Sequence, residues 1–147
     1  MILLKRNWWK SFNVFWQLPT LKKFNLFKIA IYLVFFKVAL KMLPFNKFIN
    51  FFKFLIRTNK SIQYNSGIIF DISENVKTVS NNLVFHSTCL IQALTTKLLL
   101  RFDKNIVLII GVCLKNGFEA HAWIEKDGNY IVGDEAVANF TPILCLK

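Results

Sequence analysis

Apolar residues recur at helical spacing through the first 55 residues of the chain. Segment 1–20 has aromatic residues every three or four positions, which predicts a short amphipathic helix ending near Pro19. Residues 20–43 predict a second helix, with Thr20 as its N-cap, and Pro44 begins a third. The apolar faces consist of Trp8, Phe12, Phe15 and Trp16 in the first helix; Leu26, Ile29, Ala30, Leu33, Phe36 and Leu40 in the second; and Phe45, Phe48, Ile49, Phe52 and Leu55 in the third.

None of these segments predicts a helix that spans a membrane. The apolar run 29–36 is only eight residues long before Lys37 interrupts it, whereas a spanning helix needs about 20 apolar residues. Segment 1–20 also lacks the cleavage site of a secretory signal. Two interpretations of 20–43 stay open. It is either an interfacial helix on anionic lipid or, as we favour, a helix packed on its own domain or on a partner.

Polar residues dominate segment 57–82, which is rich in Asn and Ser and contains the first acidic residues. Scattered apolar positions indicate that short elements anchor this segment, including a helix before the next region. We therefore divide the chain into a basic aromatic helical region (1–56), a polar connector (57–82) and a final compact region (83–147).

The final region combines one helix with several strands. Ser87 or Thr88 caps a predicted helix from Cys89 to Leu100. An apolar, β-branched run follows, and then an alternating segment; Gly-containing turns separate the runs. The C-terminal residues are apolar enough to pack back onto the core. This pattern is typical of an α+β domain, with predicted strands at 106–113, 118–125 and 130–132.

Composition separates a basic front from a near-neutral remainder. The chain has 147 residues, which suits one domain with an appendage, and its 54% hydrophobic content and mean hydropathy of +0.42 exclude disorder. Residues 1–60 contain twelve Lys and Arg and no acidic residue, so the net charge of +11 arises there. These basic residues are spread among apolar faces without a recognition motif, and we therefore expect no nucleic-acid partner.

Cysteine usage favours a reducing compartment. Cys89, Cys113 and Cys145 are odd in number and show no CxxC spacing, which argues against a disulfide framework. With only two histidines in the chain, no ligand pattern predicts a metal site. We expect a cytoplasmic protein that needs neither a metal nor a cofactor.

Three residues of the final region form a candidate catalytic set. Cys89 begins a helix, where the macrodipole and free backbone N–H groups stabilise a thiolate and a developing oxyanion. His121 lies mid-strand between small neighbours, which leaves access for a base to reach its nucleophile. Asp134 follows the next strand, where it can bind the second imidazole nitrogen. Nucleophile, base and orienting acid thus occur in this order on separate elements.

Each member of this set has a simpler explanation or a rival. Cys89 alone is more simply a small buried hydrophobic residue, and His121 alone is a solvent-facing strand residue. His86 is the rival base, although we interpret it as a loop residue bordering the site. Trp123 shares the His121 face and is a candidate substrate-site residue, or else ordinary packing. Weaker candidates are Cys113 and Cys145 as core thiols, Asp127 as a turn residue, and Glu125 and Glu135 as solvated acids.

At these residues the sequence resembles the lasso-peptide maturation B protein family. Cys-Leu-x-x-x-Leu opens a helix at Cys89, Gly-Val closes a strand at Gly111, and Phe-x-Ala-His-Ala-Trp-x-Glu spans 118–125. The resemblance covers about residues 83–144, with a weaker likeness at Leu-Pro-Phe, 43–45. Ile91, Gln92 and Ala93 stand where the family often has a basic residue, and Asn105 stands where a Gly usually occurs.

The resemblance implies both a fold and a function. The fold is a papain/transglutaminase-like core, with a central helix on a small antiparallel sheet, preceded by basic helices. Cys89, His121 and Asp134 are implied as the triad of a cysteine peptidase that removes the leader of a precursor peptide. The implied partners are that peptide, a separate leader-recognition protein and a macrolactam synthetase. Apart from the resemblance, the basic aromatic front is a candidate docking surface, either for the recognition protein and leader or for peripheral contact with a membrane.

Two other function classes remain open. The first is another thiol acyl transfer on the same core, as in transglutaminases, which incorporation of an added amine would reveal. The second is a non-enzymatic, basic, membrane-associated binding protein.

Overall fold

The computed structural model describes residues 19–83, 85, 87–115, 117–133 and 137–147. The helix predicted within the first twenty residues lies almost entirely outside this range, as do His86, Asp134 and Glu135.

Two prolines set the boundaries of the first described helices. Helix α2 spans Thr20–Met42 and helix α3 spans Phe45–Ile56, and their N-cap positions are Pro19 and Pro44. Thr20 is therefore the first helical residue and not the cap that we predicted. Leu43 is extended between the helices, because the residue before a proline disfavours helical backbone. Both helices were predicted from their apolar period, and both are confirmed.

Helix α4 (Ser66–Asn82) occupies most of the polar segment that follows. Asn65 caps it, accepting a hydrogen bond from the backbone N–H of Ile68 at 2.8 Å. Its buried side combines Ile69 and Val76 with Ser73 and Ser80. The helix expected before the catalytic segment is thus present, and small serines let it lie close to its neighbours.

Helix α5 and a four-stranded antiparallel sheet complete the fold. Helix α5 runs from Cys89 to Leu99. The strand order is β3-β2-β1-β4, so the predicted meander of three strands is confirmed and the C-terminal residues add a fourth strand beside β1. The strands are β1 (Ile106–Cys113), β2 (Glu119–Lys126), β3 (Asn129–Val132) and β4 (Thr141–Leu146), with a short 3-10 turn, η1 (Val137–Asn139), before β4.

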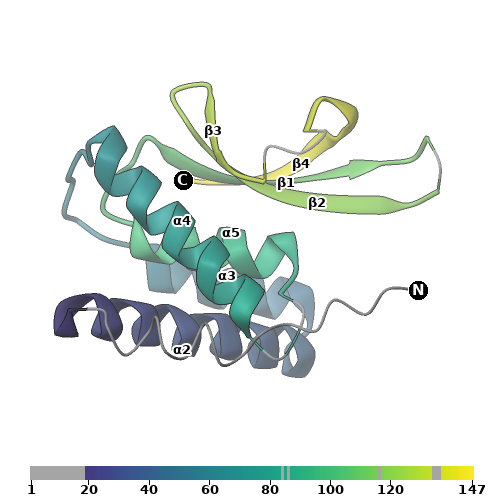
Figure 1. The fold of residues 1–147 in the computed structure, drawn as a ribbon. Coiled ribbons are helices and arrows are strands. Elements are labelled where there is room, and N and C mark those ends of the chain that lie inside the picture. The colour runs from purple at the N-terminus through teal and green to yellow at the C-terminus, as the bar shows by residue number, and fades with distance from the viewer. Residues whose placement is uncertain (1–18, 84, 86, 116, 134–136) are drawn as a thin grey trace, which may run out of the picture.

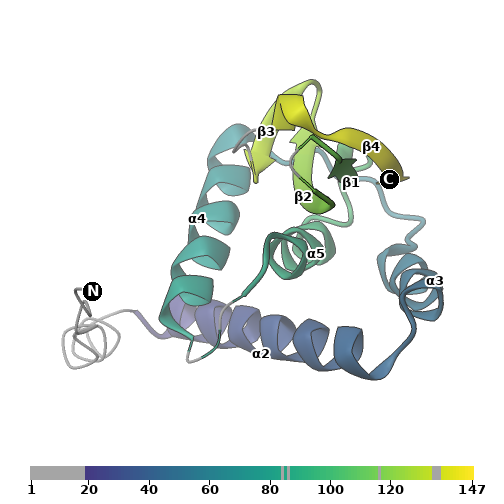
Figure 2. The same ribbon diagram turned by 90° about the vertical axis from the view of Figure 1, so that its right-hand side faces the viewer.

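All four described helices lie on one face of the sheet (Figure 1). Helix α5 is directly against the sheet, and α2 is the helix furthest from it (Figure 2). Since β3 and β4 are opposite edge strands, the connection between them crosses the sheet, and its described residues lie on the face away from the helices. The architecture is α+β, as predicted. None of the described helices is long and apolar enough to cross a bilayer.

The core lies between the sheet and α5. Ala122 and Ile124 of β2 and Leu108 and Ile110 of β1 are buried in one apolar cluster with residues of all four helices. Because strand residues alternate between faces, His121 and Trp123 lie on the opposite face. This division of β2 into two faces is the one that the sequence predicts.

A buried carboxylate ties the chain between α3 and α4 to the core. Asp103, which is 1% exposed, forms an ion pair with Lys126 at 2.9 Å and accepts hydrogen bonds from the backbone N–H groups of Tyr64 and Asn105. Lys126 also donates to the backbone carbonyl of Tyr64 at 2.9 Å. One network thereby joins β2, the turn before β1 and residue 64, which precedes α4.

The hydrogen bonds of Asp103 decide its protonation. Burial raises the pKa of its carboxyl, but the hydrogen bonds from Lys126 and two backbone N–H groups outweigh burial and hold the pKa below its ordinary value. A folded-state pKa below the unfolded one means that the stabilisation is complete above the unfolded value, about 3.9. It is lost as the pH falls further, because protonation then favours the unfolded chain.

We expect Asp103→Asn to lower the free energy of unfolding by about 3 kcal/mol at neutral pH, because it leaves the Lys126 ammonium without its buried counter-charge. Urea denaturation checks this, with Asp71→Asn as the matched control at an exposed position. On acidification below about pH 4 the wild type should lose stability that the variant has already lost. Equal midpoints for both variants would contradict the role of the network.

Candidate active site

Cys89 is the first residue of α5 and follows the N-cap residue Thr88. Its side chain is half-buried and lies against the apolar core. The first backbone N–H groups of a helix have no partner within the helix, so they face the space around this thiol. Cys113 is also half-buried, whereas Cys145 is exposed on the edge strand β4, contrary to our expectation of a core thiol. Of the three cysteines, Cys89 is the one that begins a helix and is also partly accessible to solvent.

The fold brings the helix of Cys89 against the strand of His121. Helix α5 packs on β2, and the turn at residues 100–105 reverses the chain between α5 and β1. The first residue of α5 and the beginning of β2 therefore lie towards the same end of this packing. Within the described part of the chain, no hydrogen bond joins Cys89 to His121, because α5 lies on one face of the sheet and the ring of His121 lies on the other.

The imidazole of His121 is held on the face of the sheet that points away from the helices. Its Nε2 atom lies 2.8 Å from the backbone carbonyl oxygen of Gly133, just after β3. Its ring stacks with Trp123, with centroids 6.2 Å apart, and contacts Phe140, with centroids 5.2 Å apart. Contacts from β2 itself, from the residue after β3 and from the residue before β4 thus hold the ring.

The contact with Gly133 determines which nitrogen of His121 can act as a base. A carbonyl oxygen only accepts, so Nε2 must donate and carries the proton. In the neutral imidazole Nδ1 is then the unprotonated nitrogen, with a lone pair free to take a proton. This is the arrangement in which a partner on one nitrogen sets the tautomer and the other nitrogen performs general-base chemistry.

Asp134 itself lies outside the described residues. Its neighbour Gly133 has φ of +76°, and a Cβ there would lie 2.7 Å from the carbonyl oxygen of Ala122 and 3.3 Å from Nε2 of His121. Only glycine therefore allows the chain to pass this close to the imidazole.

Trp123 is a packing residue of this face. It is 2% exposed, and its ring lies over Gly111, where an added Cβ would approach the indole to 2.9 Å. Its Nε1 atom is buried without a hydrogen-bond partner in the described structure. Trp123 therefore acts on the site through the ring of His121 and not through an exposed surface, and its predicted contact with substrate stays a prediction.

The sequence did not point to Gly133 or Phe140 as parts of this site. Gly133 had one available signal, a glycine between a strand and an acidic pair in Val-Gly-Asp-Glu. Phe140 had none, because the chain crossover that brings it over β2 depends on the sheet order. No group of three or more metal-ligating side chains occurs in the described ranges.

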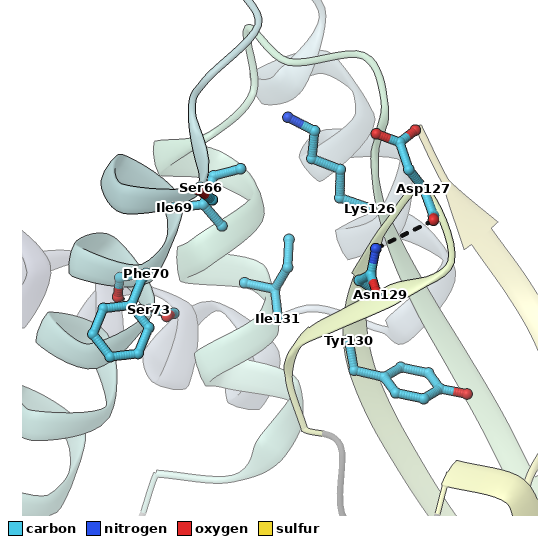
Figure 3. Close-up of a pocket in the computed structure, with 9 residues that line it drawn as sticks. All are labelled: Ser66, Ile69, Phe70, Ser73, Lys126, Asp127, Asn129, Tyr130 and Ile131. Carbon is cyan, nitrogen blue, oxygen red and sulfur yellow. Dashed lines mark hydrogen bonds between the residues drawn. The ribbon is translucent and has the colours of Figure 1, made fainter.

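A groove lies beside β3, on the strand that leads to Gly133. It has a volume of about 410 Å³ and separates α4 from the β2–β3 turn. Figure 3 shows Ile131 of β3 extending towards α4, with Phe70 and Ser73 of α4 lining the other side. Lys126 and Asn129 add polar groups at the turn. This groove is open, partly apolar and adjacent to the strand whose end contacts His121.

Comparison with known proteins agrees with this arrangement of helix and sheet. A family model described as the transglutaminase-like superfamily matches residues 37–145, from the end of α2 to β4. The match covers most of the chain, and the chain belongs to the transglutaminase-like superfamily. No curated protein and no solved structure matches it.

We expect Gly133→Ala to destabilise the protein by about 2 kcal/mol more than Gly128→Ala. Both glycines have positive φ, 76° and 81°, but a Cβ at Gly128 meets no atom within 4 Å. The control thus measures backbone strain alone, and the difference measures the close approach to Ala122 and His121. Chemical denaturation gives both values. Equal losses would mean that the contact with β2 is not tight.

Proposed function

We propose that this protein is a cysteine peptidase with Cys89 as nucleophile, His121 as base and Asp134 as orienting acid. The observation that carries the proposal is the position of Cys89 at the start of α5 in a transglutaminase-like chain. This superfamily usually contains enzymes with a Cys-His-Asp triad. The backbone carbonyl of Gly133 shows that the segment next to Asp134 reaches Nε2, and in this proposal the Asp134 carboxylate replaces that carbonyl as the acceptor.

In the proposed reaction the Cys89 thiol transfers its proton to Nδ1 of His121, and the thiolate attacks the scissile carbonyl. Backbone N–H groups at the start of α5 stabilise the oxyanion. The imidazolium returns the proton to the leaving amine, and water then hydrolyses the thioester with His121 again as base. In the described structure Cys89 lies on the helix side of the sheet and the ring of His121 on the other face, so this reaction requires a rearrangement that brings the sulfur and Nδ1 to the same side.

We propose that the substrate is a ribosomally made precursor peptide whose leader is removed during lasso-peptide maturation. The support is the resemblance of segment 118–125 to the lasso-peptide B proteins. In this proposal the core region 83–147 performs the cleavage, and the basic region 1–56 docks a separate leader-recognition protein. A macrolactam synthetase acts on the freed N-terminus. The reaction takes place in the cytoplasm, with the chain in peripheral contact with the membrane.

A departure from the B-protein pattern bears on substrate contacts. Where those proteins often have a basic residue after Cys-Leu, Ile91 and Ala93 are buried here, and the Gln92 side chain donates to the hydroxyl of Ser80 at 2.9 Å. This turn of α5 therefore contacts α4 and not the substrate. Substrate charge would have to be recognised elsewhere.

The second candidate function is acyl transfer to an amine on the same thioester. The superfamily assignment favours it as directly as it favours hydrolysis, because both reactions share the nucleophile, the base and the acyl-enzyme. The two differ only in whether water or an amine attacks the thioester.

We expect one cleavage of the precursor, with the candidate recognition protein present, and a loss of at least about a thousandfold in Cys89→Ala and His121→Ala. Mass spectrometry of the products measures this. Cys145→Ala is the matched control, since it removes an exposed thiol far from α5 in sequence. Incorporation of an added amine in place of hydrolysis would move the assignment to acyl transfer. Unchanged cleavage in Cys89→Ala would remove Cys89 from the mechanism.

A further inference from the structure

Helix α2 has two apolar sides, and within the described residues one of them packs on the rest of the fold while the other is exposed. Ile29, Leu33 and Phe36 are buried against the rest of the protein. A second set of apolar side chains recurs at spacings of three and four residues along the other side and is exposed. We call this set the outer face of α2: Phe24, Phe27, Ile31, Val34, Phe35, Val38 and Met42.

Single exposed apolar side chains are normal on a protein surface, but the outer face of α2 is a larger and continuous apolar patch. Its members are between 41% and 76% exposed, and they follow one side of the helix for nearly its full length. Phe51 of α3, whose ring centroid is 6.1 Å from that of Phe35, extends it. Soluble proteins rarely expose contiguous apolar patches of this kind unless the patch binds something.

Positive charge borders the outer face on both sides. At about 100° per residue, Lys28 falls at one edge of the apolar stripe and Lys41 at the other, and both are exposed. The first acidic residue of the chain is Asp71, so no carboxylate lies in α2 or α3. Apolar side chains flanked by lysines, with no acid between them, are complementary to a surface that is apolar within and negative at its rim.

We propose that the outer face of α2 lies in the headgroup region of an anionic membrane. Lysines at the two borders reach lipid phosphates while the aromatic and aliphatic side chains enter the acyl boundary. A second copy of this chain fits the face less well, since it would bring the bordering lysines of both copies together. The inference deepens the proposed peripheral contact and rests on that part of the proposed function alone.

The fold orients the candidate active site with respect to this surface. Helix α2 is the helix furthest from the sheet, and all the described helices lie on the same face of the sheet (Figure 1). Docking through α2 therefore leaves the outer face of the sheet in water.

The test is flotation of the full chain with vesicles of phosphatidylglycerol and phosphatidylethanolamine, beside vesicles of phosphatidylcholine. Binding should require the anionic lipid and weaken as salt is raised. We expect Phe27→Glu to reduce partitioning at least about tenfold. Phe118→Glu is the matched control, because Phe118 is 75% exposed but lies in the β1–β2 connection. Circular dichroism verifies that both variants fold.

A charge-matched pair tests the lysines separately. The double substitution of Lys28 and Lys41 by Gln should weaken binding to anionic vesicles, while the same change at the exposed residues Lys77 and Lys104 should not. The proposal is overturned if wild type ignores anionic vesicles, if Phe27→Glu and Phe118→Glu bind alike, or if Phe27→Glu abolishes self-association without any effect on vesicles. Leader cleavage without vesicles is measured on the same variants, so a failure of the peptidase assignment is seen independently.

Discussion

The enclosure of α5 is the constraint on which the other elements depend. Helices α2, α3 and α4 and the sheet all contact it (Figure 2), so the polar residues Thr95, Thr96 and Lys97 of α5 are buried. Thr95 donates to the backbone carbonyl of Ile91, and the Lys97 ammonium donates to that of Ile106. Burial lowers the pKa of Lys97 to about 8, although the negative charge of Asp103 acts to raise it. A helix held from every side in this way positions its first residue, Cys89, through the whole core.

The elements that could be predicted were those whose burial is one-sided and regular. The apolar period of α2 and α3 and the alternation of β2 each predicted a single type of secondary structure. Helix α4 was harder to place, because Ser73 and Ser80 occupy two of its four buried positions and hide the apolar period. Strand β4 was seen only as an apolar tail. It is an edge strand with most positions exposed, and Pro142 within it argues against a strand.

The candidate site, too, could be predicted from the sequence only in part. Cys89 and His121 were recognisable because a helix start and a mid-strand histidine between alanines are local patterns. The hydrogen-bond partner of the imidazole is the backbone carbonyl of Gly133. Every residue has such a carbonyl, so the sequence does not reveal which one contacts the ring. The outer position of His121 on the sheet follows from which face of β2 the helices cover, and that depends on packing between distant segments.

The late pairing of β4 has a consequence for folding. Strand β1 is the most apolar run of the sheet, and β4 is the strand that covers its second edge. During synthesis β1 can pair with β2 well before β4 has emerged, so for that interval an apolar edge with unpaired backbone groups is open to other chains. Once β4 is in place, the exposed edge becomes its own, where Pro142 offers no N–H to a neighbour. Strand β4 thus protects the completed sheet, and not the nascent one, from pairing with other chains.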